Sequence, residues 1–376
     1  MKILMVETGG WGGITHYTYN LLEGLARARK QSSLSLLTNY AYELRDKPRH
    51  FALLETHIRD SHYLKGVSLI AKAVSREKPD LVHIQSVISA RKDWVFFVLA
   101  RVFGIRLVYT AHNILPHEES ERNAFGLKFS FAMIYRFSNA IIVHSNFARE
   151  ELIRTFRVDP GKIRVIDHGN YLFADTGSFD KRRSRESLGI DPDAKVMLHF
   201  GAIREYKGID ELLYAFAAVV KGLPEAVLMI VGPALEKKTP ERCRMLIKKL
   251  GLEAKVVLKE GYVPLDEVPL YFSCCDAAVF PYRRIYSSGA LHLAYAFSKP
   301  VIAFATGALK ESIEDGNNGL LVEPNDIGGL SMAMSRLLRE DELRGRMGKA
   351  SFELAVTRFS WDRIGEETMK FYSELS

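Results

Sequence analysis

Residues 276–323 read DAAVFPYRRIYSSGALHLAYAFSKPVIAFATGALKESIEDGNNGLLVE. Two short apolar runs in this segment, Ala277–Phe280 and Val301–Phe304, are typical of buried strands. The residues between them, Ala290–Phe297, predict a helix. A strand, a loop, a helix and a second strand in this order predict a parallel α/β unit. In such a unit the loop lies at the carboxyl edge of the sheet, where open α/β folds bind their ligands.

The loop ahead of the predicted helix contains Ser287, Ser288 and Gly289. The first turn of a helix has unpaired backbone N–H groups, which suit an oxygen-rich or anionic ligand. We therefore expect this loop, together with Ala290, to form part of an anion-binding site.

Three features of this segment carry a family resemblance. Lys299–Ala303, Glu311 and Asp315–Val322 are together similar to the nucleotide-sugar half of GT-B glycosyltransferases, above all to the large retaining group numbered family 4. The resemblance implies an α/β fold of two Rossmann-like domains whose parallel sheets face across a cleft. It also implies that the C-terminal domain binds a sugar-nucleotide donor.

One departure from the family pattern concerns recognition of the donor's hydroxyl groups. Most family members carry two glutamates eight positions apart, one at the donor sugar and one at the ribose. This chain has Ile285 and Leu293 in those places, and neither side chain accepts a hydrogen bond. We expect Ser287 and Ser288 to act at the nucleoside instead, while the backbone N–H groups of 288–290 assist at the donor diphosphate.

The length of the chain, 376 residues, is enough for two hydrophobic cores. No apolar run approaches the roughly 20 residues that span a bilayer, and the apolar start Met1–Val6 is too short for a signal peptide. We therefore expect a cytoplasmic protein, with peripheral contact to the inner face of the membrane as a further possibility.

A polar stretch, Asp175–Asp193, separates two series of strand and helix patterns and predicts the domain linker. We expect an N-terminal, acceptor-binding Rossmann-like domain at 1–172, a linker at 173–194 and a nucleotide-sugar-binding domain at 195–357. By resemblance, a last helix at 358–376 crosses back to the first domain. The basic cluster Lys181–Arg185 falls in the linker and predicts a solvated face.

Charge and cysteine content restrict the partners. The net charge of +7 favours anionic partners such as nucleotide sugars, lipid phosphates or a membrane surface. No nucleic-acid partner is expected, because the basic residues are spread along the chain. Cys243, Cys274 and Cys275 show neither a disulfide pattern nor metal-ligand spacing, so core positions are expected, with a redox role as the remote alternative.

The first domain begins with an apolar strand, Lys2–Val6, followed by a glycine-rich loop and a helix from near Ile14. The loop lacks the third glycine of the dinucleotide-binding fingerprint. In the family that the chain resembles, the glycine pair approaches the donor diphosphate. Gly12 and Gly13 fit that role because a side chain would block close approach. A plain tight turn is the alternative.

His112 follows the predicted strand Arg106–Ala111. The resemblance implies that His112 faces the donor sugar and is catalytic, and we expect the acceptor near His16 and His112. A turn histidine bonded to the backbone is the alternative.

The apolar helix Trp94–Phe103 predicts burial against the sheet, with a membrane contact as the alternative. The remaining elements expected in this domain are strands at 34–38, 81–85, 141–144 and 163–166 and helices at 61–76 and 146–156.

In the second domain the strand Val196–Phe200 is followed by Arg204 and Lys207, and then by a helix from Ile209 with a regular apolar face. Two cations beside a helix N-terminus predict a diphosphate site, and a solvated surface pair is the alternative. Lys207 matches the lysine of the family pattern. The family's arginine position holds Ala202, and Arg204 lies two residues later.

Residues 260–263 follow a predicted strand at 255–259. By resemblance, this turn meets the nucleotide base, with Tyr262 and Val263 at the nucleoside. A tyrosine that is merely packed is the alternative. The other elements expected here are a strand at 226–231, helices at 241–250 and 265–274, and a last helix that begins at 359–361.

Together these features predict a retaining, metal-independent hexosyltransferase in polysaccharide or glycolipid synthesis. The expected donor is of the UDP-glucose or GDP-mannose class, and the expected acceptor is a saccharide or lipid-linked saccharide. No cofactor is expected, since the nucleotide sugar is a co-substrate. Lys207 and Arg204 would stabilise the departing diphosphate. A sugar-nucleotide 2-epimerase of the same fold and a non-catalytic sugar-binding protein are the alternatives.

Overall fold

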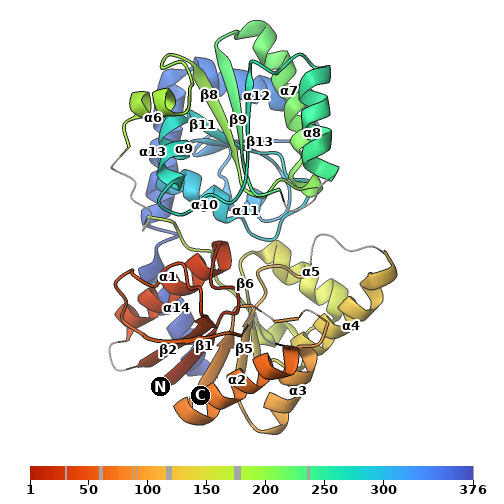
Figure 1. Cartoon of the computed structure of the whole chain (residues 1–376), viewed down its shortest axis with the longest axis vertical. Helices are drawn as coiled ribbons and strands as arrows, with labels where there is room; N and C mark the ends of the chain where they lie inside the picture. Colours follow the sequence, from red (N-terminus) through yellow and green to blue (C-terminus); the bar gives the residue numbers. More distant parts are fainter. Residues whose placement is uncertain are drawn as a thin grey trace. The chain divides into compact units, whose positions relative to one another are not determined.

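The computed structural model describes residues 1–29, 32–58, 62–86, 88–89, 91–115, 121–172, 179–234 and 238–375, with only the backbone for 121–124 (Figure 1). Contacts within the chain divide it into two units. The first comprises Met1–Gly169 and Phe359–Ser376, and the second comprises Asn170–Arg358. Within the described ranges, no helix is long and apolar enough to cross a membrane.

The described part of the first unit contains a seven-stranded parallel sheet with the order β3-β2-β1-β4-β5-β6-β7. Its strands are β1 (Lys2–Val6), β2 (Ser33–Asn39), β3 (Ala52–Thr56), β4 (Leu81–Ile84), β5 (Leu107–Thr110), β6 (Ala140–Val143) and β7 (Ile163–Val165). Its helices are α1 (Gly13–Ala28), α2 (Tyr63–Glu77), α3 (Trp94–Val102), α4 (Glu121–Phe137), α5 (Asn146–Phe156) and α14 (Trp361–Glu374). The sequence predicted each of these strands except β3, which is half-exposed and lacks a buried apolar run.

The last helix, α14, packs on α1 through two glycines. A Cβ atom on Gly24 would lie 2.3 Å from the carbonyl oxygen of Trp361, and one on Gly365 would lie 2.3 Å from the carbonyl carbon of Gly24. Only glycine permits this separation of the two helices. The hydroxyl of Ser360 accepts a hydrogen bond from the backbone N–H of Arg363 and so caps α14, which begins where the sequence predicts.

The described part of the second unit contains a six-stranded parallel sheet with the order β10-β9-β8-β11-β12-β13. Its strands are β8 (Lys195–Phe200), β9 (Ala226–Gly232), β10 (Val256–Glu260), β11 (Ala277–Phe280), β12 (Val301–Phe304) and β13 (Gly319–Val322). Its helices are α6 (Lys181–Ser187), α7 (Ile209–Gly222), α8 (Lys238–Lys249), α9 (Val268–Cys274), α10 (Gly289–Ala296), α11 (Leu309–Ser312), α12 (Ile327–Arg339) and α13 (Asp341–Val356), with a 3-10 turn η2 (Glu205–Lys207).

Each sheet reverses its strand order at one point. In the first unit the chain moves from β1 outward through β2 and β3 and returns to the other side of β1 with β4. In the second unit the equivalent reversal lies between β8 and β11. Loops leave the sheet in opposite directions at such a point and open a crevice at the carboxyl ends of the strands. The loops after β1 and after β8 are therefore the places where ligands are expected.

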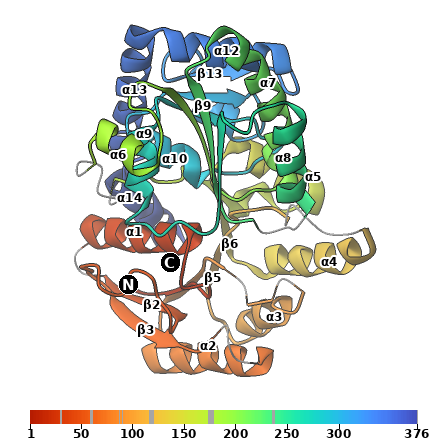
Figure 2. The ribbon, with the colours of Figure 1, turned by 45° about the horizontal axis from the view of Figure 1, so that its top comes forward.

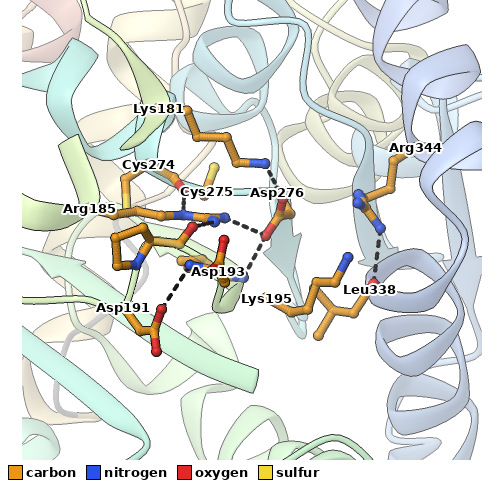
Figure 3. A network of polar contacts seen from close by, with 12 residues as sticks. Lys181, Arg185, Asp191, Asp193, Lys195, Cys274, Cys275, Asp276, Leu338 and Arg344 are labelled. Atoms are coloured by element: carbon orange, nitrogen blue, oxygen red, sulfur yellow. Dashed lines mark hydrogen bonds and ion pairs between the residues drawn. The ribbon is translucent and has the colours of Figure 1, made fainter. Parts of the chain in front are cut away.

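The predicted linker at 173–194 is wrong over its described part. Residues 173–178 lie outside the described ranges, whereas 179–194 belong to the second unit and contain α6. Arg185 of α6 is only 4% exposed and does not lie on a solvated face. Its guanidinium donates to the carboxylate of Asp276 at 2.8 Å and to the carbonyls of Cys274 and Pro192 (Figure 3).

Asp276 precedes β11 and holds several elements together. Its carboxylate also accepts hydrogen bonds from the backbone N–H of Val196 in β8 at 2.6 Å and from Lys181 at 2.5 Å (Figure 3). Burial raises the pKa of Asp276, but Lys181, the Val196 amide and Arg185 outweigh burial and leave this pKa below its ordinary value. The neighbouring Cys274 and Cys275 are fully buried, as the sequence predicts.

We expect Arg185→Met to lower the free energy of unfolding by about 3 kcal/mol, because removal of one partner leaves a buried carboxylate with less compensation. Urea unfolding at pH 7 measures this loss. The matched control is Arg182→Met on the same helix, whose side chain is exposed and pairs with Glu186, and its effect should stay within about 0.5 kcal/mol. Equal losses in the two variants would contradict the assigned role of Arg185.

Candidate functional site

The loops that follow β8 and β11 are held together at the carboxyl edge of the second sheet. Gly208 ends η2 with a φ of 67°, and a Cβ atom there would lie 1.9 Å from the carbonyl oxygen of Pro281. The backbone N–H of Arg283 donates to the carbonyl of Tyr206 at 2.9 Å. This close contact places the residues after β8 beside the loop that leads from β11 to α10.

Lys207 lies at this junction and is 7% exposed. Its Nζ atom is 3.6 Å from the centroid of the Tyr282 ring and 5.1 Å from that of Tyr206. No carboxylate in the described part of the chain forms an ion pair with this amine. Burial, with a smaller contribution from the positive charge of Arg204, lowers the pKa of Lys207 to about 7. The site is therefore a buried amine without a counter-ion. An anion bound there would raise the pKa of the amine and favour its protonated, charged form.

His199 of β8 contributes to the same environment. Its Nδ1 atom lies 3.0 Å from the carbonyl oxygen of Val279, and among the described residues Nε2 has no hydrogen-bond partner. Burial and the charge of Lys207 lower its pKa to about 3, so the imidazole is neutral. His199 was not singled out from the sequence, although its position near the end of a buried strand was a usable signal.

The N-terminus of α10 also lies in this region. Ser288 is buried and caps the helix, because its hydroxyl accepts from the backbone N–H of Leu291 at 3.3 Å. A Cβ atom on Gly289 would lie 2.7 Å from the hydroxyl oxygen of Tyr171, so a larger residue would require the Tyr171 ring to shift. Ser287 immediately precedes the cap, and Ala290 lies in the first turn. The helix begins one residue before the predicted position.

The two hydrophobic residues at the family's glutamate positions are part of the core. Ile285 and Leu293 are both buried. A Cβ atom on Gly307 would lie 2.1 Å from the carbonyl oxygen of Ile285, so this backbone is closely packed. These positions therefore fill the interior, and neither side chain offers a polar group to a ligand.

Tyr262 and Val263 follow β10, two strands away from β8. The side chain of Tyr262 is 42% exposed, whereas Val263 is buried. An exposed ring at the carboxyl edge of the sheet is compatible with base stacking, and the nucleoside role of both residues stays a prediction.

In the first unit, two carboxylates organise the glycine-rich loop after β1. Glu7 is 1% exposed and accepts hydrogen bonds from the backbone N–H groups of Gly9 at 2.6 Å and Gly10 at 2.9 Å. The carboxylate of Glu43 accepts from the backbone N–H of Gly12 at 3.0 Å and lies 3.0 Å from Nε2 of His16. The sequence analysis overlooked both glutamates, which lie beside the loop in space.

This arrangement gives the amide of Gly12 a partner within its own unit. The N–H group of Gly12 donates to Glu43, and the diphosphate role of Gly12 and Gly13 stays a prediction. A Cβ atom on Gly12 would meet nothing within 4 Å, so its φ of 80°, not close approach, explains the glycine. Gly13 opens α1 and is exposed. The positive φ of Gly12 agrees with the tight turn that the sequence offers as the alternative.

His112 belongs to a row of polar side chains that follow four neighbouring strands: Gln85 after β4, His112 after β5, His144 after β6 and His168 after β7. Nε2 of His112 lies 3.0 Å from the side-chain oxygen of Gln85, and Nδ1 lies 3.2 Å from Nε2 of His144. Nδ1 of His144 lies 3.0 Å from the carbonyl oxygen of Ile166. Both ring nitrogens of His112 therefore have partners within its own unit.

The histidine row packs around the buried ring of Tyr17, whose centroid lies 4.8 Å from that of His112 and 5.1 Å from that of His168. Burial lowers the pKa of His112 well below its ordinary value, that of His144 to about 4 and that of His168 to about 3. The pKa of His83, a fully buried residue within β4, is lowered by burial to about 3 as well. All four rings are neutral at pH 7. Within the part of the chain that the structure describes, no group of three or more His, Cys, Asp or Glu residues is arranged to hold a metal ion.

We expect stability to fall as the pH drops from about 6.5 towards 4, because the unfolded chain binds protons at these four histidines before the folded chain does. Urea unfolding gives the free energy of unfolding at each pH, and its slope with pH gives the number of protons taken up on unfolding. His144→Gln should reduce the uptake near pH 5 by about one proton. His62→Gln, a change of an exposed histidine that begins α2, serves as the control and should leave the uptake unchanged. Equal uptake in the wild type and in His144→Gln would contradict the neutral, buried state of the row.

Comparisons with known proteins agree with this architecture. A family model described as Glycosyltransferase Family 4 matches residues 11–169, and one described as Glycosyl transferases group 1 matches residues 180–354. A D-inositol 3-phosphate glycosyltransferase of Corynebacterium efficiens is 28% identical over 306 residues, which are 78% of this chain and 71% of that protein. A D-inositol 3-phosphate glycosyltransferase 2 of Catenulispora acidiphila is 30% identical over 63% of this chain and 56% of that protein.

Solved structures share the fold over the full chain. The Anabaena protein Alr3699/HepE, crystallised with UDP and glucose, has a TM-score of 0.80 at 21% identity, with all of both chains covered. A sucrose-phosphate synthase of Thermosynechococcus elongatus has a TM-score of 0.78 at 22% identity and covers 100% of this chain and 98% of its own. Together, the two family models, the two parallel-sheet Rossmann-like units and these structures show that the chain belongs to the GT-B glycosyltransferases, with the group 1 family in its second unit and family 4 in its first.

Proposed function

We propose that the protein is a retaining glycosyltransferase that moves a hexose from a nucleotide-diphosphate sugar to a saccharide or lipid-linked saccharide. The observation that carries the proposal is the buried amine of Lys207, which has no carboxylate partner among the described residues. A cation in such a place costs stability unless an anion binds it. The donor diphosphate supplies that anion.

The groups around Lys207 suit a departing nucleoside diphosphate. Arg204 lies close enough to lower the pKa of Lys207, and it adds a second positive charge. The N-terminus of α10 adds backbone N–H groups from residues 288–290. Fixed cations and dipoles stabilise negative charge that develops on a leaving group without a proton transfer to it. We therefore propose that Lys207, Arg204 and this helix terminus promote departure of the diphosphate, with neither a metal nor a cofactor.

The donor is proposed to be of the UDP-glucose or GDP-mannose class. Nucleotide-sugar transfer is supported by the names of the relatives, which are D-inositol 3-phosphate glycosyltransferases, and by the structural neighbour that was crystallised with UDP and glucose. Tyr262 is proposed to stack on the base, with Val263 and Ser287 beside the nucleoside. The family's two glutamates are absent, so backbone groups and Ser288 are proposed to recognise the donor hydroxyls.

The acceptor is proposed to bind the first unit. His16 and Glu43 form a polar pair at the start of α1, and two carboxylates, Glu7 and Glu43, occupy the loop amides there. Glu7 is buried, whereas the side chain of Glu43 is partly exposed, and a carboxylate accepts hydrogen bonds from hydroxyl groups and repels phosphate, so we propose a neutral saccharide beside Glu43. His112 is proposed to act as an acceptor-side residue held in place by Gln85 and His144. We also propose that the reaction takes place in the cytoplasm, in polysaccharide or glycolipid synthesis.

The binding of UDP to the wild type is expected to weaken about tenfold for each pH unit above 7, because the free amine of Lys207 must take up a proton to pair with the diphosphate. Isothermal titration between pH 7 and pH 9 measures this dependence. Lys207→Met should bind UDP weakly, with little change over the same range. It should remain folded, because an apolar side chain replaces an uncompensated buried amine.

The matched control is Lys221→Met, a change of an exposed lysine on α7, and its binding should follow the wild type. If Lys207→Met kept the wild-type affinity and pH dependence, the diphosphate assignment would be wrong. GDP and ADP are titrated in parallel, because the nucleotide bound most tightly identifies the donor class.

The reaction itself is tested with the preferred nucleotide sugar and a panel of saccharide acceptors. Nuclear magnetic resonance of the first product distinguishes the two anomers, and a product with the donor's anomeric configuration is expected. An inverted product would refute retention. Isomerised nucleotide sugar without transfer would favour the 2-epimerase alternative, and tight binding without turnover would favour a sugar-binding protein.

A further inference from the structure

The outer face of α3 and α4 in the first unit carries large apolar side chains in contact with solvent. The sequence predicts that the apolar helix 94–103 is buried, but only one side of it, with Phe96, Phe97 and Ala100, packs inward. The apolar face comprises Val95, Leu99, Val102, Phe103, Phe125 and Phe129. Val102, Phe103 and Phe125 are 73%, 76% and 85% exposed.

These side chains are grouped on two helices that pack against each other. Val95, Leu99, Val102 and Phe103 recur at helical spacing and lie on one side of α3. Phe125 and Phe129 are one turn apart on α4. The two helices pack together, and the rings of Trp94 and Phe129 meet edge to face with centroids 5.7 Å apart. Figure 2 shows α3 and α4 on the outer side of the sheet.

Positively charged side chains lie on the same two helices as the apolar face and next to them. Exposed cations on or next to the two helices are Arg91, Lys92, Arg101, Lys128 and Arg136. Among the described side chains of 91–106 and 125–137, Asp93 is the only carboxylate. It is buried and accepts hydrogen bonds from the backbone N–H groups of Ile88 and Ser89, so it does not offset the surface charge. The exposed charges described here are therefore all of one sign.

We propose that this face docks on the surface of an anionic phospholipid bilayer. Apolar side chains that stand out of the surface enter the boundary between headgroups and acyl chains, and the surrounding cations pair with lipid phosphates. The long stems of lysine and arginine let their charges stay at headgroup level while the apolar residues insert. A protein partner would need a complementary acidic surface with pockets for protruding phenylalanines, whereas an anionic bilayer supplies both properties without specific shape.

The proposal goes beyond the transfer reaction, and direct binding measurements test it independently of catalysis. The protein is sedimented with vesicles of phosphatidylcholine and roughly 40% phosphatidylglycerol, whose surface is strongly anionic. The measurement is made at low and at high salt. Vesicles of phosphatidylcholine alone are the comparison. The wild type should bind the anionic vesicles at least about tenfold more tightly, and salt should weaken this binding.

Two sets of variants separate the apolar from the electrostatic contribution. Val102→Ser with Phe103→Ser and Phe125→Ser should reduce binding about tenfold or more at every salt concentration. Arg101→Gln with Lys128→Gln and Arg136→Gln should reduce binding to anionic vesicles and remove most of its salt dependence. The matched controls lie on α8 of the second unit, where Met245→Ser removes an exposed apolar side chain and Lys248→Gln with Lys249→Gln removes two exposed charges.

The controls should bind as the wild type does, and thermal unfolding confirms that all variants are folded. The proposal is overturned if the wild type does not sediment with anionic vesicles, or if the α8 variants lose as much binding as those of the apolar face. Light scattering of the free protein tests whether a second copy of the chain occupies this face. A concentration-dependent dimer that the serine substitutions abolish would assign this face to a second copy of the chain instead.

Discussion

The buried carboxylate of Asp276 joins the two strands on which the candidate donor site depends. It lies at the start of β11 and accepts the backbone N–H of Val196 at the start of β8, while Arg185 and Lys181 compensate its charge. The opposite ends of these strands lead to Lys207 and Tyr282. Because parallel strands keep one register along their length, a fixed amino end also fixes the separation of these two side chains. The position of the Lys207 amine over the Tyr282 ring therefore depends on a hydrogen-bond network at the far edge of the sheet.

Lys207 lies in a place where its positive charge costs stability. An amine in this place would be more stable with a carboxylate beside it, yet its described neighbours are the aromatic rings of Tyr206 and Tyr282, the neutral imidazole of His199 and the cation of Arg204. The rings stabilise the cation moderately and do not compete with a phosphate. A carboxylate would compete. Local rules of stability are commonly broken at functional sites for this reason.

The two units carry side chains of opposite charge at the loops where their strand order reverses. In the second unit the loop after β8 contains a lysine and an arginine, whereas in the first unit the loop after β1 is bound by Glu7 and Glu43. The same backbone architecture therefore carries a cationic loop in one unit and a loop held by carboxylates in the other. The fold alone does not determine what each unit binds, because that depends on the side chains at the strand ends.

Short-range patterns in the sequence determined the elements, and β11, β12 and α5 have the predicted bounds. Lys207 and the start of α10 each lie in a loop between a strand and a helix, as the local pattern predicts. The sequence did not reveal β3, whose residues are half-exposed and lack a clear period. Only the tertiary structure decided the pairings over long distances. The sequence places Arg185 in a linker because its partner Asp276 is 91 residues away, and it does not show that Glu43, 31 residues away, accepts the amide of Gly12. The row from Gln85 to His168 likewise exists only because β4 to β7 lie side by side. Backbone hydrogen bonding and apolar periodicity act between near neighbours and can be read from the chain, whereas compensation of a buried charge depends on which distant segments the topology brings into contact.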